Sequence, residues 1–300
     1  MMENCPKVSV IIPTYKRPDK LDRAIKSILV QTYQNVEVIV VDDNDPNTEG
    51  RCLTENLMLA YADCSKVRYV KHPYNKNGSA ARNTGAAACN ADYISFLDDD
   101  DEFLPTKIES QIRRLEELDN TYGCCYSKYA TRKDGGKLVV GQEHREGYLY
   151  VEALCRELCT MAGSNLLIKR GAFESIGGFD ESFKRHQDVE FLTKLLQKYK
   201  IAYDNNLGLI VNVHKQNDKV DYQKILDQYE EAFLPTVNLL GNDVKKRFYY
   251  NINIQRFWDF LRTKHDIHGA INMIAGKKIT VLEAIRYSAV QTINFIRRKM

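Results

Sequence analysis

Four consecutive aspartates, residues 98–101, form the most unusual polar cluster in the chain. Neighbouring carboxylates repel one another unless a cation lies among them, and Mg²⁺ and Mn²⁺ prefer carboxylate and phosphate oxygens. The run follows an apolar stretch, residues 93–97, that is typical of a buried strand. A strand holds alternate side chains on one side, so Asp98 could contact a sugar or ribose hydroxyl while Asp100 contacts a metal ion. The alternative is a solvated loop with a helix cap before Pro105.

Two further aspartates, Asp42 and Asp43, end a second apolar stretch at residues 36–41. A carboxylate at such a strand end can accept hydrogen bonds from a nucleobase or a ribose. The alternative is an ordinary turn, because the sequence Asp-Asn-Asp-Pro at residues 43–46 is common turn chemistry.

Residues 76–83 combine a glycine with basic side chains at the expected start of a helix. The N-terminus of a helix favours anions, and Arg82 could hold a diphosphate there. The alternative for Arg82 is a surface salt bridge. The sequence lacks both G-x-G-x-x-G and G-x-x-x-x-G-K-[ST], which argues against a dinucleotide dehydrogenase and a P-loop NTPase.

Two isolated residues of the second half could also carry chemistry. Asp188 precedes an apolar helical pattern, so it could cap that helix or act as a general base towards an acceptor hydroxyl. His214 follows a short apolar stretch and could be a metal ligand or a structural histidine.

The elements that must position these residues alternate between strand and helix patterns. Apolar runs at residues 8–12, 36–41, 67–70 and 93–97 predict strands, and helical patterns lie at 21–29, 54–62, 79–89 and 108–115. This order predicts an α/β fold with a doubly wound, mostly parallel sheet, in which polar loops at the carboxyl ends of the strands form the ligand crevice.

The second half has a different pattern. We expect a hairpin turn at residues 134–136, a strand at 166–169, a helix face at 192–199 and two short strands that end near His214. From about residue 220 the pattern is helical. The predicted domains are therefore 1–215, with a nucleotide-binding half to about 102 and an acceptor half at 103–215, and a helical extension at 216–300.

The composition excludes several classes of protein. The chain of 300 residues has 43 basic and 40 acidic side chains, a balance that argues against a nucleic-acid binder. Its 8 cysteines include no C-x-x-C pair, so we expect reduced thiols of a cytoplasmic protein. The N-terminus does not resemble a signal peptide, and no run approaches the roughly 18 to 20 apolar residues of a membrane span.

Seven segments in this order resemble the family 2 glycosyltransferases with the GT-A fold. The resemblance covers roughly residues 5–215. The matching segments are residues 8–17, 31–43, 78–85, 93–101, 164–170, 177–180 and 187–188.

The resemblance implies a role for each candidate. The nucleotide pocket would be lined by Pro13, Thr14, Tyr15 and Arg17, with Asp42 on the base, Arg82 on the diphosphate, and Asp98 and Asp99 also on the nucleotide. The metal, Mn²⁺ or Mg²⁺, would be held by Asp100, with His214 near it, and Asp99 and Asp101 could compete for that place. Asp188 would be the catalytic base; the family commonly has Glu-Asp where this chain has Gln187 and Asp188.

The implied reaction is a single displacement that inverts the anomeric configuration. The donor would be a nucleotide sugar, typically a UDP-sugar, and the acceptor a saccharide or lipid-linked saccharide in capsule, O-antigen or exopolysaccharide synthesis at the inner face of the membrane. A nucleotidyltransferase would have a glycine-rich loop after the first strand, and residues 13–17 contain no glycine. A catalytically inactive scaffold is disfavoured by the presence of Asp98, Asp100 and Asp188.

The last segment, residues 277–300, has apolar side chains at helical spacing among basic ones. Such a helix could lie on an anionic membrane, or pack on the catalytic domain or on a second subunit of a homodimer. The apolar positions are Leu282, Ile285, Ala289, Ile293 and Ile296, and the basic ones Lys277, Lys278, Arg286, Arg297, Arg298 and Lys299.

Overall fold

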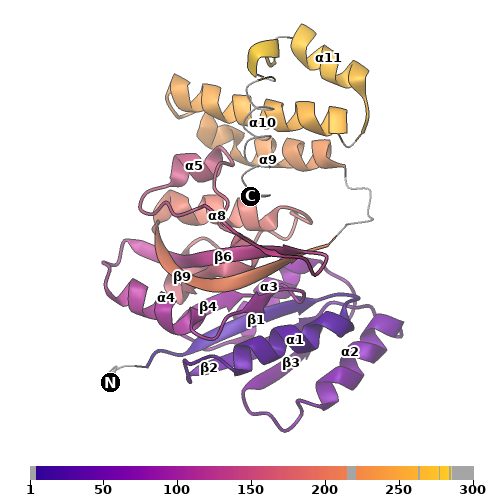
Figure 1. Cartoon of the computed structure of the whole chain (residues 1–300), viewed down its shortest axis with the longest axis vertical. Helices are drawn as coiled ribbons and strands as arrows, with labels where there is room; N and C mark the ends of the chain where they lie inside the picture. Colours follow the sequence, from indigo (N-terminus) through magenta and orange to yellow (C-terminus); the bar gives the residue numbers. More distant parts are fainter. Residues whose placement is uncertain (1–4, 215–220, 263, 277, 284, 286–300) are drawn as a thin grey trace. The chain divides into compact units, whose positions relative to one another are not determined.

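The computed structural model describes residues 5–214, 221–262, 264–276, 278–283 and 285 (Figure 1). The chain folds into two compact units: Met1–Tyr150 with Leu158–Lys215, and Val151–Glu157 with Gln216–Met300. Each unit is described by itself below.

Four parallel strands form the N-terminal half of the first unit. β2 (Val36–Asp42) is buried along its whole length, as expected for a parallel strand covered on both faces. Its neighbours in the order β3-β2-β1-β4 are β3 (Val67–Lys71), β1 (Val8–Thr14) and β4 (Tyr93–Phe96). The connecting helices are α1 (Pro18–Leu29), α2 (Glu49–Leu59) and α3 (Gly78–Ala88). This confirms the predicted alternation, although α2 begins before the expected residue 54 because Thr48 caps its first turn.

The second half of the first unit makes the sheet mixed. β8 (Leu166–Lys169) pairs antiparallel with both β4 and β6 (Tyr122–Lys133). β6 in turn pairs parallel with β9 (Lys200–Val213), and β5 (Glu102–Phe103) lies antiparallel on β9. α4 (Lys107–Glu116) connects β5 to β6. The predicted turn at residues 134–136 is confirmed, since it joins β6 to β7 (Leu138–Val140) as a hairpin.

The two short strands expected before His214 are one strand, β9. Ser127 of β6 pairs with Asp204 and Lys128 with Leu207, so Asn205 and Asn206 form a bulge between two paired regions. The polar residues of this bulge interrupt the apolar pattern, which is why the sequence indicated two strands.

Three more helices complete the first unit around the sheet. They are α6 (Ala162–Asn165), α7 (Arg170–Ser175) and α8 (Gln187–Lys198). The apolar face predicted at residues 192–199 is confirmed, because Leu192, Leu195 and Leu196 of α8 are buried. α6 is short but central, since it lies between β4 and α8, the elements that carry the predicted site.

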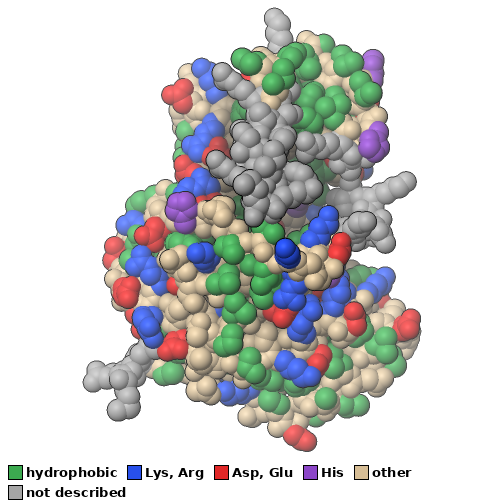
Figure 2. Space-filling model, in the orientation of Figure 1, with side chains coloured by type: hydrophobic (Ala, Val, Ile, Leu, Met, Phe, Trp, Pro, Cys, Tyr) green, Lys and Arg blue, Asp and Glu red, His purple; other side chains and the backbone are tan. Residues whose placement is uncertain are grey.

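The second unit is helical, with α9 (Tyr222–Val237), α10 (Asn242–Arg262) and α11 (Ile267–Ala275). Ile254 and Phe257 of α10 pack against Ala270 and Met273 of α11. Ile267 and Ile271 are exposed, and Figure 2 shows hydrophobic side chains gathered over α11. No helix within the described ranges is both long and apolar enough to cross a membrane.

The segment Val151–Glu157 belongs to the second unit, whereas the sequence placed it in the acceptor half of the first domain. α5 (Tyr150–Leu154) covers most of it. Arg247 of α10 forms salt bridges with Glu152 and Glu157, and the Tyr229 hydroxyl donates to the Leu154 carbonyl at 3.1 Å. These contacts, made by residues distant in sequence, explain the difference.

Candidate active site

The four aspartates do not continue strand β4. The strand ends at Phe96, and residues 98–101 form a turn in which the Asp101 amide donates to the Asp98 carbonyl at 3.0 Å. The alternation expected of a strand therefore does not apply to these side chains. Each of the four carboxylates instead has its own protein partners, which reduces the repulsion between them.

Two of the four carboxylates are buried and occupied. Asp99 accepts from the Thr14 hydroxyl at 2.8 Å, and burial raises the pKa of Asp99 to about 7. Asp101 accepts from the Ser164 hydroxyl at 2.6 Å and from the Asn212 amide at 2.9 Å. Burial, reinforced by the charge of neighbouring carboxylates, raises the pKa of Asp101 well above its usual value. Asp101 is thus closed to a metal ion. Asp99 is bonded to Thr14 and lies 3.5 Å from Arg17, and the nucleotide contacts expected of Thr14 and Asp99 stay a prediction.

The other two carboxylates are accessible and paired with arginines. Asp98 forms a salt bridge with Arg82, and its side chain remains 41% exposed. Asp100 pairs with Arg17 at 2.7 Å, and its Oδ2 lies 3.9 Å from Nε2 of His214. Burial raises the pKa of Asp100 although Arg17 opposes that shift. Asp98 and Asp100 therefore pair with different arginine side chains, Arg82 and Arg17.

The side chains near Asp100 suit a weakly held divalent ion. Within the described part of the chain, no group of three or more His, Cys, Asp or Glu side chains could hold a metal. Mg²⁺ is often bound by only one or two carboxylates and completes its shell with substrate phosphates and water. Asp100 and His214 fit that arrangement, and they do not fit a closed structural site.

Arg82 extends from α3 towards the aspartates. Asn77, with a φ of 99°, caps α3 by accepting from the amides of Ser79 and Ala80. Arg82 is buried and donates to the Gly78 carbonyl at 3.2 Å in addition to its salt bridge with Asp98. The guanidinium of Arg82 thus lies near the N-terminus of α3, and the positive charge together with the helix dipole favours an anionic group there.

The roles of the two adjacent aspartates after β2 differ from the expectation. The Asp42 carboxylate is fully buried and accepts from the Asn44 amide, the Asn44 side chain and the Tyr69 hydroxyl. It has no exposed surface to offer a base, so the predicted base contact of Asp42 is not available in this structure.

Asp43 organises the loop that leads into α3. Its carboxylate accepts from the backbone amides of Lys76 at 2.8 Å and Asn77 at 2.9 Å, and from His72 at 2.7 Å. The sequence left two possibilities for Asp43, a hydrogen bond to a nucleobase or ribose and an ordinary turn. In the structure it fixes the residues that cap α3 and thereby positions Arg82.

The remaining candidates from the first loop lie at the open end of β1. Pro13 is half-buried, while Tyr15 and Arg17 are exposed, with 38% of Tyr15 accessible. Lys16, with a φ of 58°, donates its amide to Asn44 at 2.9 Å, which holds this loop against the end of β2. Tyr15 and Arg17 are therefore available to a ligand at the carboxyl end of the sheet.

Asp188 lies in the first turn of α8, opposite Asp98. A Cβ added to Gly163 would lie 3.4 Å from Oδ2 of Asp98 and 4.0 Å from Oδ2 of Asp188, so the two carboxylates flank Gly163. Burial and the nearby charge of Asp98 raise the pKa of Asp188, while Arg82 opposes that shift. A carboxylate with a raised pKa is a stronger base, which suits removal of a proton from a hydroxyl group.

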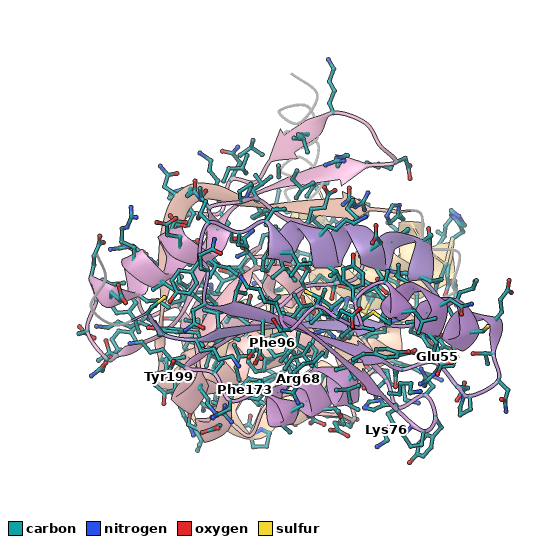
Figure 3. The ribbon with its side chains drawn as sticks, turned by 90° about the horizontal axis from the view of Figure 1, so that it is seen from below. Glu55, Arg68, Lys76, Phe96, Phe173 and Tyr199 are labelled. Carbon is teal, nitrogen blue, oxygen red and sulfur yellow. The ribbon has the colours of Figure 1, made fainter. Side chains whose placement is uncertain are left out.

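The position of α8 is fixed by an aromatic cluster beneath it. Phe179 and Phe191 stack with ring centroids 4.2 Å apart, and Phe96 at the end of β4 meets Phe179 edge to face at 5.1 Å. Figure 3 shows Phe96 and Phe173 close together, with ring centroids 5.9 Å apart. The strand that ends at the aspartates and the helix that begins at Asp188 therefore share one core.

The 160–165 segment connects these parts, and the sequence reasoning did not identify its role. The Ser164 hydroxyl donates to Asp101 and accepts from the Asp98 amide at 3.0 Å. The Asn165 side chain donates to the carbonyls of Ser127 and Thr160. Ser164 and Asn165 open one of the segments that carried the resemblance, which is the only signal that pointed to them.

Lys107 anchors the 160–165 segment from inside the core. It is fully buried, and its Nζ donates to Gln111 at 2.7 Å and to the carbonyl and side chain of Asn165 at 2.9 and 3.2 Å. Three acceptors match the three donors of an ammonium group. Burial lowers the pKa of Lys107 to about 7. Sequence reasoning missed this residue because lysine is almost never fully buried.

Comparison with known proteins points to one family. A family model for Glycosyl transferase family 2 matches residues 9–177. The chain is 32% identical over 233 residues to an uncharacterized glycosyltransferase of Rickettsia felis. The matched region covers 76% of this chain and 37% of that protein. It is also 32% identical over 234 residues to one of Rickettsia prowazekii, covering 76% and 70%. The chain thus spans little more than a third of the first relative.

Two further similarities are more limited. The chain is 32% identical over 122 residues to the GalNAc(5)-diNAcBac-PP-undecaprenol beta-1,3-glucosyltransferase of Campylobacter jejuni, covering 40% of this chain and 38% of that protein. Among solved structures, S. aureus TarS 1-349 in complex with UDP matches with a TM-score of 0.64 at 15% identity. That match covers 94% of this chain and 78% of TarS 1-349, and supports the GT-A fold.

We expect Lys107→Met to lower the free energy of unfolding, because each orphaned buried acceptor costs about 1 to 3 kcal/mol. The loss should depend on pH. The folded pKa of about 7 lies below the usual lysine value, so the unfolded chain binds more protons above pH 7 and stability rises with pH. The stability of the natural chain relative to Lys107→Met should therefore increase from pH 7 to 9, by at most about 1.4 kcal/mol per pH unit.

Urea unfolding of both proteins between pH 6 and 9 measures this difference. Lys137→Met, at an exposed position next to β7, is the matched control and should show no such trend. A pH-independent difference for Lys107→Met would contradict a lowered pKa for Lys107.

Proposed function

The chain belongs to glycosyl transferase family 2, and we propose that it moves a sugar from a UDP-sugar to an acceptor hydroxyl with inversion at the anomeric carbon. The observation that carries this proposal is the pair of carboxylates that flank Gly163, one held by Arg82 and the other with a raised pKa. Asp98 would lie on the donor side and Asp188 on the acceptor side.

The reaction needs one proton transfer and one displacement. Asp188 would accept the proton of the acceptor hydroxyl as its oxygen bonds to the anomeric carbon. The bond from that carbon to the diphosphate oxygen breaks at the same time, and its electron pair leaves with UDP. Arg82 and Arg17 would stabilise the charge that develops on the diphosphate, since fixed cations act strongly where charge appears. Because attack and departure occur on opposite faces, the configuration inverts.

A divalent cation would supply further charge stabilisation to the departing diphosphate. Asp100 and His214 are the residues that would hold it, as their accessible positions near each other support. Arg17, which pairs with Asp100 in this structure, would then be free to contact the nucleotide.

Two observations support UDP as the nucleotide of the donor. The solved structure of similar fold contains UDP, and Tyr15 offers an exposed aromatic ring at the end of β1, where a base could stack. Pro13 would line the same pocket. With Asp42 buried, we assign base recognition to this first loop rather than to the aspartate after β2.

For the acceptor we propose a saccharide or lipid-linked saccharide used for cell-surface polysaccharide on the cytoplasmic side of the membrane. The Campylobacter jejuni relative, by its name, acts on an undecaprenol-linked saccharide. Exposed apolar side chains in the second unit support contact with such a membrane. They are Ile267, Ile271, Val281, Leu282 and Ile285, and Lys278 lies among them. The rest of the predicted stripe, together with Lys277 and Arg286, lies outside the described residues.

Asp188→Asn should lower turnover by about 10² to 10⁴-fold, because general base catalysis contributes about that factor. UDP affinity should stay the same, since the base contacts the acceptor. The raised pKa also predicts that kcat of the natural enzyme rises with pH as Asp188 loses its proton, and that the variant lacks this rise.

Transfer of labelled sugar and calorimetric titration with UDP measure the two effects, with Glu174→Gln on the exposed surface of α7 as control. Weak UDP binding with normal turnover in Asp188→Asn would assign the residue to the donor instead. No turnover by the natural chain with any nucleotide sugar would indicate an inactive scaffold.

Asp100→Ala should abolish metal-dependent transfer while leaving the fold intact, because Asp100 lies at the surface of the site. Removal of divalent ions from the natural enzyme should have the same effect and be reversed by Mn²⁺ or Mg²⁺. Activity against metal concentration, with the exposed Asp63→Ala as control, checks both statements. Near-normal activity of Asp100→Ala in either ion would make the metal assignment wrong.

If the second unit contacts a membrane, the full chain should sediment with anionic vesicles. The double variant Ile267→Ser, Ile271→Ser should sediment with them less. Leu239→Ser is a matched control, because Leu239 is 87% exposed and lies in the turn between α9 and α10. Equal binding of all three proteins would remove the membrane hypothesis, and a concentration-dependent change in mass that the double variant abolishes would favour a homodimer.

A further inference from the structure

Gly163 lies next to both Asp98 and Asp188, the two carboxylates of the proposed reaction. A Cβ built on it would lie 3.4 Å from Asp98 Oδ2, 3.9 Å from Asp188 Cβ and 4.0 Å from Asp188 Oδ2. The position is partly exposed, so solvent reaches it. Any side chain at this residue would therefore stand directly in front of both carboxylates.

Neither backbone conformation nor packing requires glycine here. Gly163 lies inside α6, and its φ is not in the left-handed region that favours glycine. The distances from an added Cβ are ordinary van der Waals contacts, so a methyl group would fit the unliganded chain. Gly85 is different, because a Cβ there would come within 2.4 Å of Ile11 and disrupt packing. The fold itself therefore does not require glycine at position 163.

The backbone at Gly163 is held firmly in place. Ser164 bonds to Asp101 and to the Asp98 amide, and Asn165 is fixed by the buried Lys107. The 160–165 segment therefore cannot retreat to make room for a larger residue. An added group would take its space from the opening between Asp98 and Asp188.

We propose that Gly163 is a specificity-determining residue, whose missing side chain leaves room for the acceptor hydroxyl and the carbon that bears it. This proposal rests on the proposed function, in which Asp188 is the base and Asp98 lies on the donor side. The acceptor would be a hydroxyl group of a saccharide, whose carbon would occupy the space that a side chain at Gly163 would fill. The site would exclude a larger group next to Gly163 while still admitting water.

Gly163→Ala tests the proposal, with Gly171→Ala as the matched control. Gly171 is also a helical glycine, in α7, and an added Cβ there meets nothing within 4 Å. We expect Gly163→Ala to lower kcat/KM for the saccharide acceptor by about 10²-fold, the loss typical of a small misplacement of reacting groups. The slow hydrolysis of donor by water should fall by less than transfer to the saccharide does, UDP affinity and thermal unfolding should stay at the level of the natural enzyme, and Gly171→Ala should change none of these quantities.

The outcomes distinguish the role of Gly163 from the proposed function on which that role rests. Unchanged acceptor kinetics in Gly163→Ala, together with an inactive Asp188→Asn, would overturn the role of Gly163 alone. A fully active Asp188→Asn would overturn the function on which it rests. If hydrolysis by water falls as much as transfer to saccharide, Gly163 acts on the donor or on the base rather than on the acceptor, which also overturns the proposal. Gly163→Ser, whose side chain has one more heavy atom than that of alanine, is the second variant and should lower kcat/KM for the saccharide acceptor at least as much.

Discussion

Four adjacent carboxylates in one turn impose the constraint on which the rest of the site depends. Their charges cannot be left together at low dielectric, so the fold must bring a separate partner to each. Thr14 is the last residue of β1, Arg17 lies in the loop after it, Arg82 comes from α3, and Ser164 and Asn212 come from the second half of the chain. Residues widely separated in sequence thus meet at residues 98–101, and the two halves of the first unit are joined by charge compensation as well as by the sheet.

The four aspartates also differ in burial and in the kind of partner they have. Asp99 and Asp101 are buried and occupied, and they serve to hold the turn, whereas Asp98 and Asp100 keep accessible surface. Arg17 pairs with Asp100 and also lies 3.5 Å from Asp99, whereas Asp101 has only a hydroxyl and an amide as the partners described above. An acidic run that looks uniform in sequence therefore contains two buried side chains and two that keep accessible surface.

The sequence predicted the parallel half of the fold well, because each strand there is a short apolar run and each connection is a helix with clear periodicity. It predicted the second half less well. The bulge at Asn205 and Asn206 broke the apolar pattern of β9, and β6 was not recognised, because the apolar residues of these mixed strands are interrupted by polar ones. Within the site, residue type indicated Asp98, Asp100, Arg82 and Asp188, since charged residues after strands or before helices are visible in any sequence.

Burial, in contrast, could not be predicted from residue type. Asp42 resembled a ligand-binding carboxylate but is enclosed by Asn44 and Tyr69, and Lys107 resembled a surface lysine but lies in the core. Gly163 has no side chain, so its residue type gives no indication of a role in the site. In each case the deciding property is what surrounds the residue in three dimensions, and the surrounding residues come from other elements.

The contacts of Val151–Glu157 have a consequence for the order in which the protein is made. This segment lies in the middle of the chain, yet Leu154 and Cys155 are buried in a unit whose other residues all follow position 215. During synthesis, domains generally fold from the N-terminus onward. Here the ribosome must release α9 and α10 before residues 151–157 can be covered. Until then, residues 151–157 lack their contacts with Arg247 and Tyr229, so this segment acquires its native packing later than the parallel strands that precede it in the chain.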